Sequence, residues 1–226
     1  MSGFGVMANP ESALAIGYAP PPRRAALMAL LDLDAALAAV LRTTREPLVG
    51  QMRLTWWHDA LTRLDSAQPP AEPVLVALGE TVLPHGITGA RLATMIEAWE
   101  ELPDADLAGG DAMARFARLR GAGLFGIAGE LLGARDSDPL VAAGVGWALI
   151  DLARHLRDHS AADKARQMAR DELIVATSAR WSRPARALGA LAHLALLDTT
   201  VPLDQPLPIA SPRRVARLAW HRMTGR

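Results

Sequence analysis

The chain has 226 residues, half of them hydrophobic, and its 24 basic side chains balance 24 acidic ones to a formal net charge of zero. This length suits one domain with a substantial core, and the balanced charge gives no indication of nucleic-acid binding. Cysteine is absent, which excludes disulfides, thiol catalysis and cysteine-ligated metal centres. Lys164 is the only lysine, so a Schiff-base mechanism is excluded at every other position.

The N-terminal stretch differs in composition from the rest of the chain. Residues 1–22 are rich in small residues, glycine and proline, so we expect a flexible lead into a single domain over 23–226. They contain no basic segment followed by an apolar one, as a secretory signal would. The longest uncharged apolar runs, 139–150 and 187–197, are shorter than the roughly 20 residues of a membrane-spanning helix. We therefore expect a soluble, cytoplasmic protein and leave peripheral contact with the inner membrane open.

Helical patterns account for almost all of the chain after this lead. Apolar residues recur at helical spacing, and several starts carry a capping side chain or a proline. Strict alternation never persists, so no strand is predicted. The expected helices, in chain order, are 23–42, 46–65, 74–83, 88–99, 111–133, 139–159, 161–176, 184–197 and 212–223. The sequence therefore predicts an all-α domain.

The helix predicted over 46–65 carries two adjacent tryptophans, Trp56 and Trp57. Neighbouring residues on a helix point about 100° apart, so we expect this helix to pack against other helices on two sides. Arg53 lies one turn before Trp57. We expect both side chains to point inward, with Arg53 reaching a cavity or a carboxylate of another helix.

Four glycines interrupt the helix predicted over 111–133, at Gly121, Gly123, Gly126 and Gly129. Glycine inside a helix costs about 1 kcal/mol relative to alanine. This cost must be recovered by close approach of another helix or by a ligand along the bare flank. We favour close helix packing.

Several of these segments resemble one protein family. Arg-Glu-Pro at 45–47, followed over 52–61 by Met-Arg-Leu-x-Trp-Trp-x-Asp-Ala-Leu, resembles the second helix of squalene/phytoene synthase-family proteins. Residues 116–133 resemble the small-residue helix that ends in Leu-Leu-Gly. Residues 146–150, followed by Arg154, resemble the helix with the second metal-binding motif. Within the family, the chain resembles the branch that contains a mitochondrial complex I assembly factor and its bacterial relatives.

The resemblance implies an isoprenoid-synthase-like bundle of antiparallel helices around a central cavity. It also implies two facing aspartate clusters, because synthases use Mg²⁺ to neutralise a departing diphosphate. In the first helix Asp32 and Asp34 are two residues apart and diverge by about 200°. Ala35, Ala36 and Ala39 stand where the resemblance places the paired aspartates. The first cluster is therefore degenerate, and we favour surface or capping roles for Asp32 and Asp34 over metal binding.

The second motif is altered in a different way. Counted from Arg154, the positions that hold aspartates in synthases hold His155 and His159. Asp151, His155 and His159 follow one another at i, i+4 and i+8, a spacing that suits a transition metal better than Mg²⁺. We favour an ion-paired polar face instead, because no fourth ligand is evident. A third interpretation is that Arg154, His155 and Arg157 hold an anion, such as a lipid phosphate, without cleaving it.

The last predicted helix carries a basic stripe beside Trp220, made of Arg213, Arg214, Arg217 and Arg222. Such a stripe suits a membrane surface or an acidic partner. A solvated helix end is the commoner case, and the sequence leaves these alternatives open.

Three functions are compatible with these observations. We predict a non-catalytic protein that binds a lipid or assists assembly of a respiratory complex, with no catalytic residue, metal or cofactor of its own. The alternatives are a prenyltransferase that condenses prenyl diphosphates with Mg²⁺ and a cavity protein that carries an isoprenoid or other lipid. The candidate ligand- or phosphate-binding residues are Asp32, Asp34, Arg53, Trp57, Asp151, Arg154, His155, Arg157 and His159.

Overall fold

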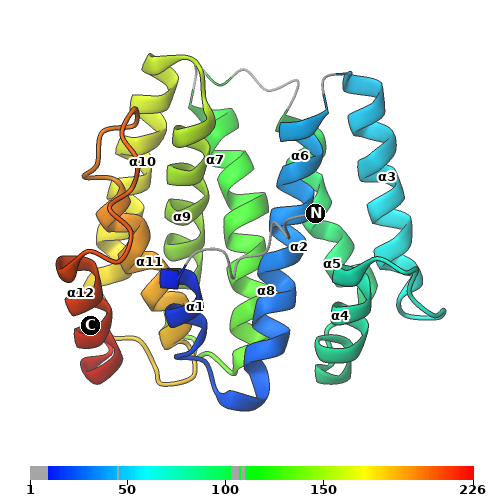
Figure 1. The fold of residues 1–226 in the computed structure, drawn as a ribbon, viewed down its shortest axis with the longest axis horizontal. Coiled ribbons are helices and arrows are strands. Elements are labelled where there is room, and N and C mark those ends of the chain that lie inside the picture. Colours follow the sequence, from blue (N-terminus) through cyan, green and yellow to red (C-terminus); the bar gives the residue numbers. More distant parts are fainter. Residues whose placement is uncertain (1–9, 45, 103–106, 108–109) are drawn as a thin grey trace.

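The computed structural model describes residues 10–44, 46–102, 107 and 110–226, and these residues contain no strand. The prediction of an all-α domain is confirmed. The first six helices are α1 Pro10–Ile16, α2 Arg24–Thr43, α3 Pro47–Arg63, α4 Pro73–Thr81, α5 Gly89–Ala93 and α6 Glu97–Glu101. The others are α7 Asp111–Ala117, α8 Gly123–Leu132, α9 Leu140–His155, α10 His159–Ser178, α11 Arg186–Asp198 and α12 Pro212–Thr224. Figure 1 shows α2 and α8 at the centre, with α3–α5 on one side and α9–α12 on the other.

The flexible lead expected over residues 1–22 is not what the structure shows from residue 10 onward. Residues 1–9 lie outside the described residues. Helix α1 buries Ala15 and Ile16 in the core, and Glu11 pairs with Arg214 of α12 at 2.7 Å. Residues 10–22 are therefore part of the helical domain, because their contacts with α12 and the core stabilise a helix too short to persist alone.

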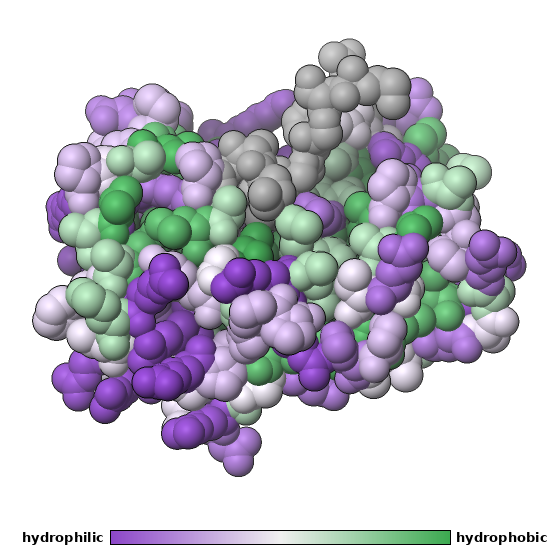
Figure 2. Space-filling view, turned by 60° about the horizontal axis from the view of Figure 1, so that its bottom comes forward, coloured by the Kyte–Doolittle hydropathy of each residue, from purple (hydrophilic) through white to green (hydrophobic). Residues whose placement is uncertain are grey.

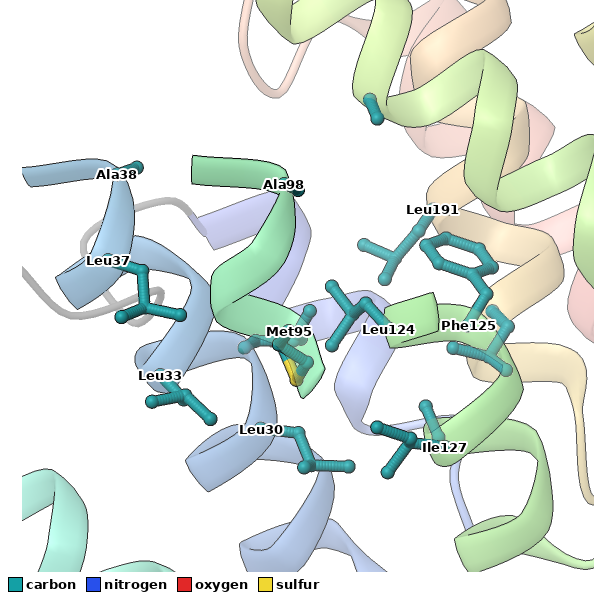
Figure 3. Packing of buried hydrophobic residues seen from close by; sticks show 14 of the residues in the cluster. Leu30, Leu33, Leu37, Ala38, Met95, Ala98, Leu124, Phe125, Ile127 and Leu191 are labelled. Carbon is teal, nitrogen blue, oxygen red and sulfur yellow. The ribbon is translucent and has the colours of Figure 1, made fainter. Parts of the chain in front are cut away.

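The core between α2 and α8 is packed with aliphatic side chains. Leu30, Leu33 and Leu37 recur at helical spacing on α2 and are completely buried. Figure 3 shows them on the side of α2 that faces Met95 and, from α8, Leu124. Fully burying one such leucine contributes about 1.5–3 kcal/mol. This packing fixes the position of α2, and with it the acidic side chains that α2 carries.

Two of the four helix glycines allow close approach of another element. A Cβ atom on Gly121 would overlap with the carbonyl oxygen of Gly144 in α9, and the reverse is also true. A Cβ atom on Gly129 would collide with a leucine side chain. The close packing expected for this helix is confirmed at these positions, whereas Gly123 and Gly126 face open space.

Helix α3 packs on one side rather than on two. Leu54, Trp57 and Leu61 are buried, but Met52 is 72% exposed and Trp56 is 46% exposed. The expectation of neighbours on both sides is wrong because α3 lies at the edge of the bundle (Figure 1). The interior position predicted for Trp57 is confirmed.

Within the described ranges, no helix has the combined length and apolar character that a membrane crossing requires.

Candidate functional site

A buried arginine connects the two helices in which the resemblance places metal-binding motifs. The side chain of Arg120 is 4% exposed and lies between α2 and α9. Its Nε and Nη2 atoms donate to the two carboxylate oxygens of Asp34 at 2.9 and 2.8 Å, and Nη1 donates to Asp151 at 2.5 Å. One guanidinium therefore bridges a carboxylate from each helix.

Aromatic rings surround the same guanidinium. Its central carbon lies 4.5 Å from the ring centroid of Trp99 and 4.8 Å from that of Trp147, with Phe116 at 5.8 Å. A cation held over an aromatic face without water gains about 2 kcal/mol. The rings and the carboxylates together hold the buried guanidinium of Arg120 in place.

The local backbone explains how this arginine reaches the interior. Residues 118–122 form a π-helical turn between α7 and α8, and such single turns are frequently found at functional sites. The wider turn changes the direction of the side chains that follow it. Gly121 comes next and allows α9 to approach closely, which brings Asp151 within reach of Arg120.

The charges in this cluster stabilise one another. Burial opposes a charged Arg120, but Asp34 and Asp151 raise its pKa overall, so the guanidinium stays protonated. Burial likewise raises the pKa of Asp151, whereas Arg120, Arg42 and His155 lower it, and the net pKa is below the ordinary value. Arg42 also donates to Asp151, at 2.9 Å. Two carboxylates and two guanidiniums thus form a network without net charge.

These residues do not fit a Mg²⁺ cluster for diphosphate. Mg²⁺ requires oxygen ligands in near-octahedral geometry. Both oxygens of Asp34 already accept from Arg120, and one oxygen of Asp151 accepts from two guanidiniums. Ala35, Ala36 and Ala39, which stand where the resemblance places the paired aspartates, offer no ligand oxygen on their side chains. Among the described residues, no group of three or more histidines, aspartates and glutamates could hold a metal ion.

Asp34 and Asp32 therefore differ in their environments. The surface or capping role expected for Asp34 is wrong, because its side chain is buried and paired with Arg120. Asp32 is partly exposed on α2, as expected for a carboxylate that points away from Asp34.

The predicted ladder of Asp151, His155 and His159 does not exist. Helix α9 ends at His155, Leu156 is extended, and Asp158 accepts from a backbone N–H to cap α10. His159 thus begins another helix, and the expectation of one helix through residue 159 is wrong. His155 is exposed, and its Nδ1 lies 2.7 Å from the backbone oxygen of Asp151. Its Nδ1 lies 3.6 Å from the Asp151 carboxylate, so these two side chains are close together, and the ion pair itself stays a prediction.

The arginines expected to bind an anion lie in different surroundings. Arg154 donates to the backbone oxygens of Asp198, Val201 and Gln205 at 3.1, 3.4 and 3.3 Å. It therefore holds the loop between α11 and α12 and does not pair with a carboxylate on its own helix. Arg157 is exposed. Whether these residues bind an anion stays a prediction.

The inward orientation predicted for Arg53 is wrong. Its side chain is exposed and donates to the hydroxyls of Thr44 and Thr43 at 2.9 and 3.3 Å. Thr43 and Thr44 lie at the C-terminal end of α2, so Arg53 donates to neutral acceptors at the surface. Trp57 contributes to the hydrophobic core and forms an edge-to-face contact with Trp56 at 5.3 Å. The structure does not bring either residue into the cluster around Arg120.

A cavity of about 160 Å³ lies beside the buried cluster and is lined by residues of α1, α9, α11 and α12. Trp147, Asp151 and Arg154 form part of its wall. Arg214 pairs with Glu11 at 2.7 Å and with Asp198 at 2.6 Å, which ties the elements of the wall together. Pockets that enclose drug-sized ligands have volumes of about 300–1,000 Å³, so this cavity suits a smaller group.

Sequence reasoning missed the central role of Arg120. The signal was present, because this arginine stands in a helix of glycine, leucine and phenylalanine. A charge in such a helix is rarely buried unless it is paired. Its two partners are 86 and 31 residues away, and local spacing does not identify partners at such separations.

Comparison with known proteins places the chain in a family. The squalene/phytoene synthase family model matches residues 8–195. The "NADH dehydrogenase (ubiquinone) complex I, assembly factor 6" of Bos taurus is 26% identical over 118 residues, which cover 52% of this chain and 35% of that protein. No solved structure matches the chain. Because the family model extends from α1 into α11, the chain belongs to the squalene/phytoene synthase family, and its helical bundle is isoprenoid-synthase-like.

Proposed function

We propose that this chain is a non-catalytic member of its family that acts by binding, as an assembly factor for a respiratory complex. The observation that carries the proposal is the position of Arg120. Its guanidinium bridges Asp34 of α2 and Asp151 of α9, and these are the two helices in which the resemblance places the metal-binding motifs. The cation between the two helices is thus a permanent part of the chain.

This arrangement removes the main driving force for diphosphate departure. Electrostatic stabilisation of a leaving group is worth several kcal/mol, and each 1.4 kcal/mol changes a rate about tenfold. Arg120 could offer its charge to a diphosphate only by leaving Asp34, which would then be buried without a partner. The free-energy cost of leaving Asp34 buried without a partner therefore disfavours catalysis.

The assembly role rests on the bovine relative, whose name describes an assembly factor of complex I. The present chain covers about a third of that relative's length, so this role is part of the proposal. The cavity that adjoins the Arg120 cluster is smaller than an isoprenoid or other lipid cargo needs, although a second pocket of about 620 Å³ lies at the start of α9. The preference for a protein partner therefore rests on the bovine relative. We propose a cytoplasmic location next to the inner membrane, where respiratory complexes are assembled.

Catalysis can be tested directly. Purified protein is incubated with farnesyl or geranylgeranyl diphosphate, Mg²⁺ and NADPH, and pyrophosphate release is measured. We expect release at the rate of buffer alone. Release well above that rate, abolished by Asp151→Ala and retained by the exposed control Asp59→Ala, would overturn the non-catalytic assignment. Both variants are first checked for folding by circular dichroism.

The assembly role requires a cellular measurement. Deletion of the gene should lower the NADH:quinone oxidoreductase activity of isolated membranes, and the wild-type chain should restore it. Mass spectrometry of gently purified protein should then identify a respiratory-complex subunit among the co-purifying molecules. Normal activity in the deletion strain would contradict the assembly role without affecting the conclusion on catalysis.

A further inference from the structure

Helix α12 presents several apolar residues to solvent and buries an arginine and a histidine against the protein. Its inner face buries Arg214 and His221 beside Leu218. Its outer face carries Trp220, which is 53% exposed, and Met223, which is 69% exposed. A surface helix of a soluble protein normally shows the opposite arrangement. The apolar outer face of α12 therefore requires an explanation beyond packing.

The outer face is continuous along the helix. Pro212, Ala216, Ala219 and Met223 recur at helical spacing and are all exposed. Val215 and Trp220 extend this strip on its two sides. We call these six residues the outer strip of α12.

Arginines flank the outer strip on both sides. Arg213 and Arg222 of α12 are exposed. The first residue of α11, Arg186, and the segment before it, with Arg180 and Arg183, add further arginines. Arg180 donates to the backbone oxygen of Thr224 at 3.2 Å, and Arg186 donates to that of Arg222 at 2.5 Å. These contacts place Arg180 and Arg186 at the C-terminal end of α12.

Few acidic groups offset this charge. Residues 180–226 contain eight arginines and two aspartates, although the whole chain is neutral. One of the two, Asp198, is already paired with Arg214. Burial and the positive charges of Arg183 and Arg180 lower the pKa of Arg186, as expected where like charges gather. Figure 2 shows strongly hydrophilic residues gathered at the left of the molecule, the side on which α12 lies in Figure 1.

We propose that the outer strip of α12 and its flanking arginines dock on the surface of an anionic lipid bilayer. An apolar strip with an aromatic residue, bordered by basic side chains, is the pattern of a helix that lies in the membrane interface. The strip enters the boundary between head groups and acyl chains, while the arginines contact lipid phosphates. A second copy of the chain is disfavoured on this face, because its arginines would meet the same positive charges.

The test is flotation of the full chain with phosphatidylcholine vesicles that contain or lack phosphatidylglycerol. We expect binding only to the anionic vesicles, and weaker binding at high salt. Arg213→Gln with Arg222→Gln should weaken binding roughly 30-fold, since each surface arginine contributes about fivefold. Trp220→Ala with Met223→Ser should also weaken binding at least about tenfold.

Matched controls come from α3, at the opposite side of the bundle (Figure 1). Met52 and Trp56 are exposed to a similar extent as the apolar pair on α12. Met52→Ser with Trp56→Ala should therefore leave vesicle binding unchanged. Circular dichroism of each variant establishes that the fold is retained.

Two results would overturn the proposal. The first is equal binding of the wild type to anionic and neutral vesicles, or binding to neither. The second is binding that depends on the arginines but not on Trp220 and Met223, which would identify an electrostatic site for an acidic protein. Neither result bears on pyrophosphate release or on assembly of the respiratory complex, so this proposal and the proposed function fail separately.

Discussion

Substitution of Arg120 by methionine tests the central cluster most directly. Methionine has a similar length but no donor, so Asp34 would stay buried without its two hydrogen bonds. Breaking a buried ion pair from one side costs about 3–5 kcal/mol, and losing the contacts with Trp99 and Trp147 adds about 1–2 kcal/mol. Proteins of this kind have a total stability of about 5–15 kcal/mol. We therefore expect Arg120→Met to remove a third or more of the stability.

The assay is urea unfolding followed by circular dichroism, where a lower midpoint at constant slope reports lost stability. The control is Arg115→Met, because Arg115 pairs with Glu101 at 2.7 Å on the surface, with 69% and 42% of the side chains exposed. Exposed pairs contribute less than about 1 kcal/mol. Adding Asp34→Asn to Arg120→Met should recover part of the loss, because it removes the uncompensated buried charge.

The pH dependence of the same cluster provides a second readout. The pKa of Asp151 is lowered, mainly by Arg120 acting against burial. The stabilisation is therefore complete above the ordinary aspartate pKa of about 4 and is lost as the pH falls through the lower folded value. The difference between wild type and Arg120→Met should shrink at acidic pH. Equal costs for Arg120→Met and Arg115→Met at neutral pH would refute the reasoning.

Two further predictions concern other parts of the bundle. Gly121→Ala should destabilise the protein by about 1–3 kcal/mol because its methyl group would collide with Gly144, whereas Gly126→Ala faces open space and should stabilise by about 0.5–1 kcal/mol. Similar unfolding midpoints for these two variants would contradict the close packing. Burial lowers the pKa of His193 to about 3 and that of His221 to about 4. Because the unfolded chain takes up protons below about pH 6.5, stability should fall by up to about 2 kcal/mol per histidine between pH 6.5 and 5; a flat profile of unfolding midpoints would contradict it.

Most of the helical framework could be predicted because its signals are local. Caps, prolines and apolar spacing act within a few residues of one another. Helix α1 was missed because its seven residues are too few for a stable isolated helix. Its stability depends on the pairing of Glu11 with Arg214, 203 residues away. The exposed face of α3 was missed for a related reason, since spacing shows that a face is apolar but not whether another helix covers it.

In the candidate site, too, local features could be predicted from the sequence, whereas contacts between distant residues could not. The prediction that the first aspartate pair is lost rests on the alanines at 35, 36 and 39, because paired ligands on one helix have a fixed spacing. It stays a prediction. The error in the second motif came from extending α9 too far. Asp158 is a capping residue at the start of α10. This signal indicates that the preceding helix ends before residue 158. The bridge from Asp34 through Arg120 to Asp151 joins three helices, and no local pattern contains all three.

The buried guanidinium of Arg120 bears on which part of the protein can carry its function. In a synthase the charge between the acidic helices arrives with the metal and diphosphate, so ligand binding stabilises that part of the fold. Here the guanidinium of Arg120 supplies this charge at all times, and the cluster with Asp34 and Asp151 is closed. Under the proposed function, this closed cluster is stable without a substrate, and Arg120 is not free to act on one. A binding function would then use the surface of the protein and not its interior. On that surface α12 carries the outer strip flanked by arginines, and α3 carries an uncovered apolar face.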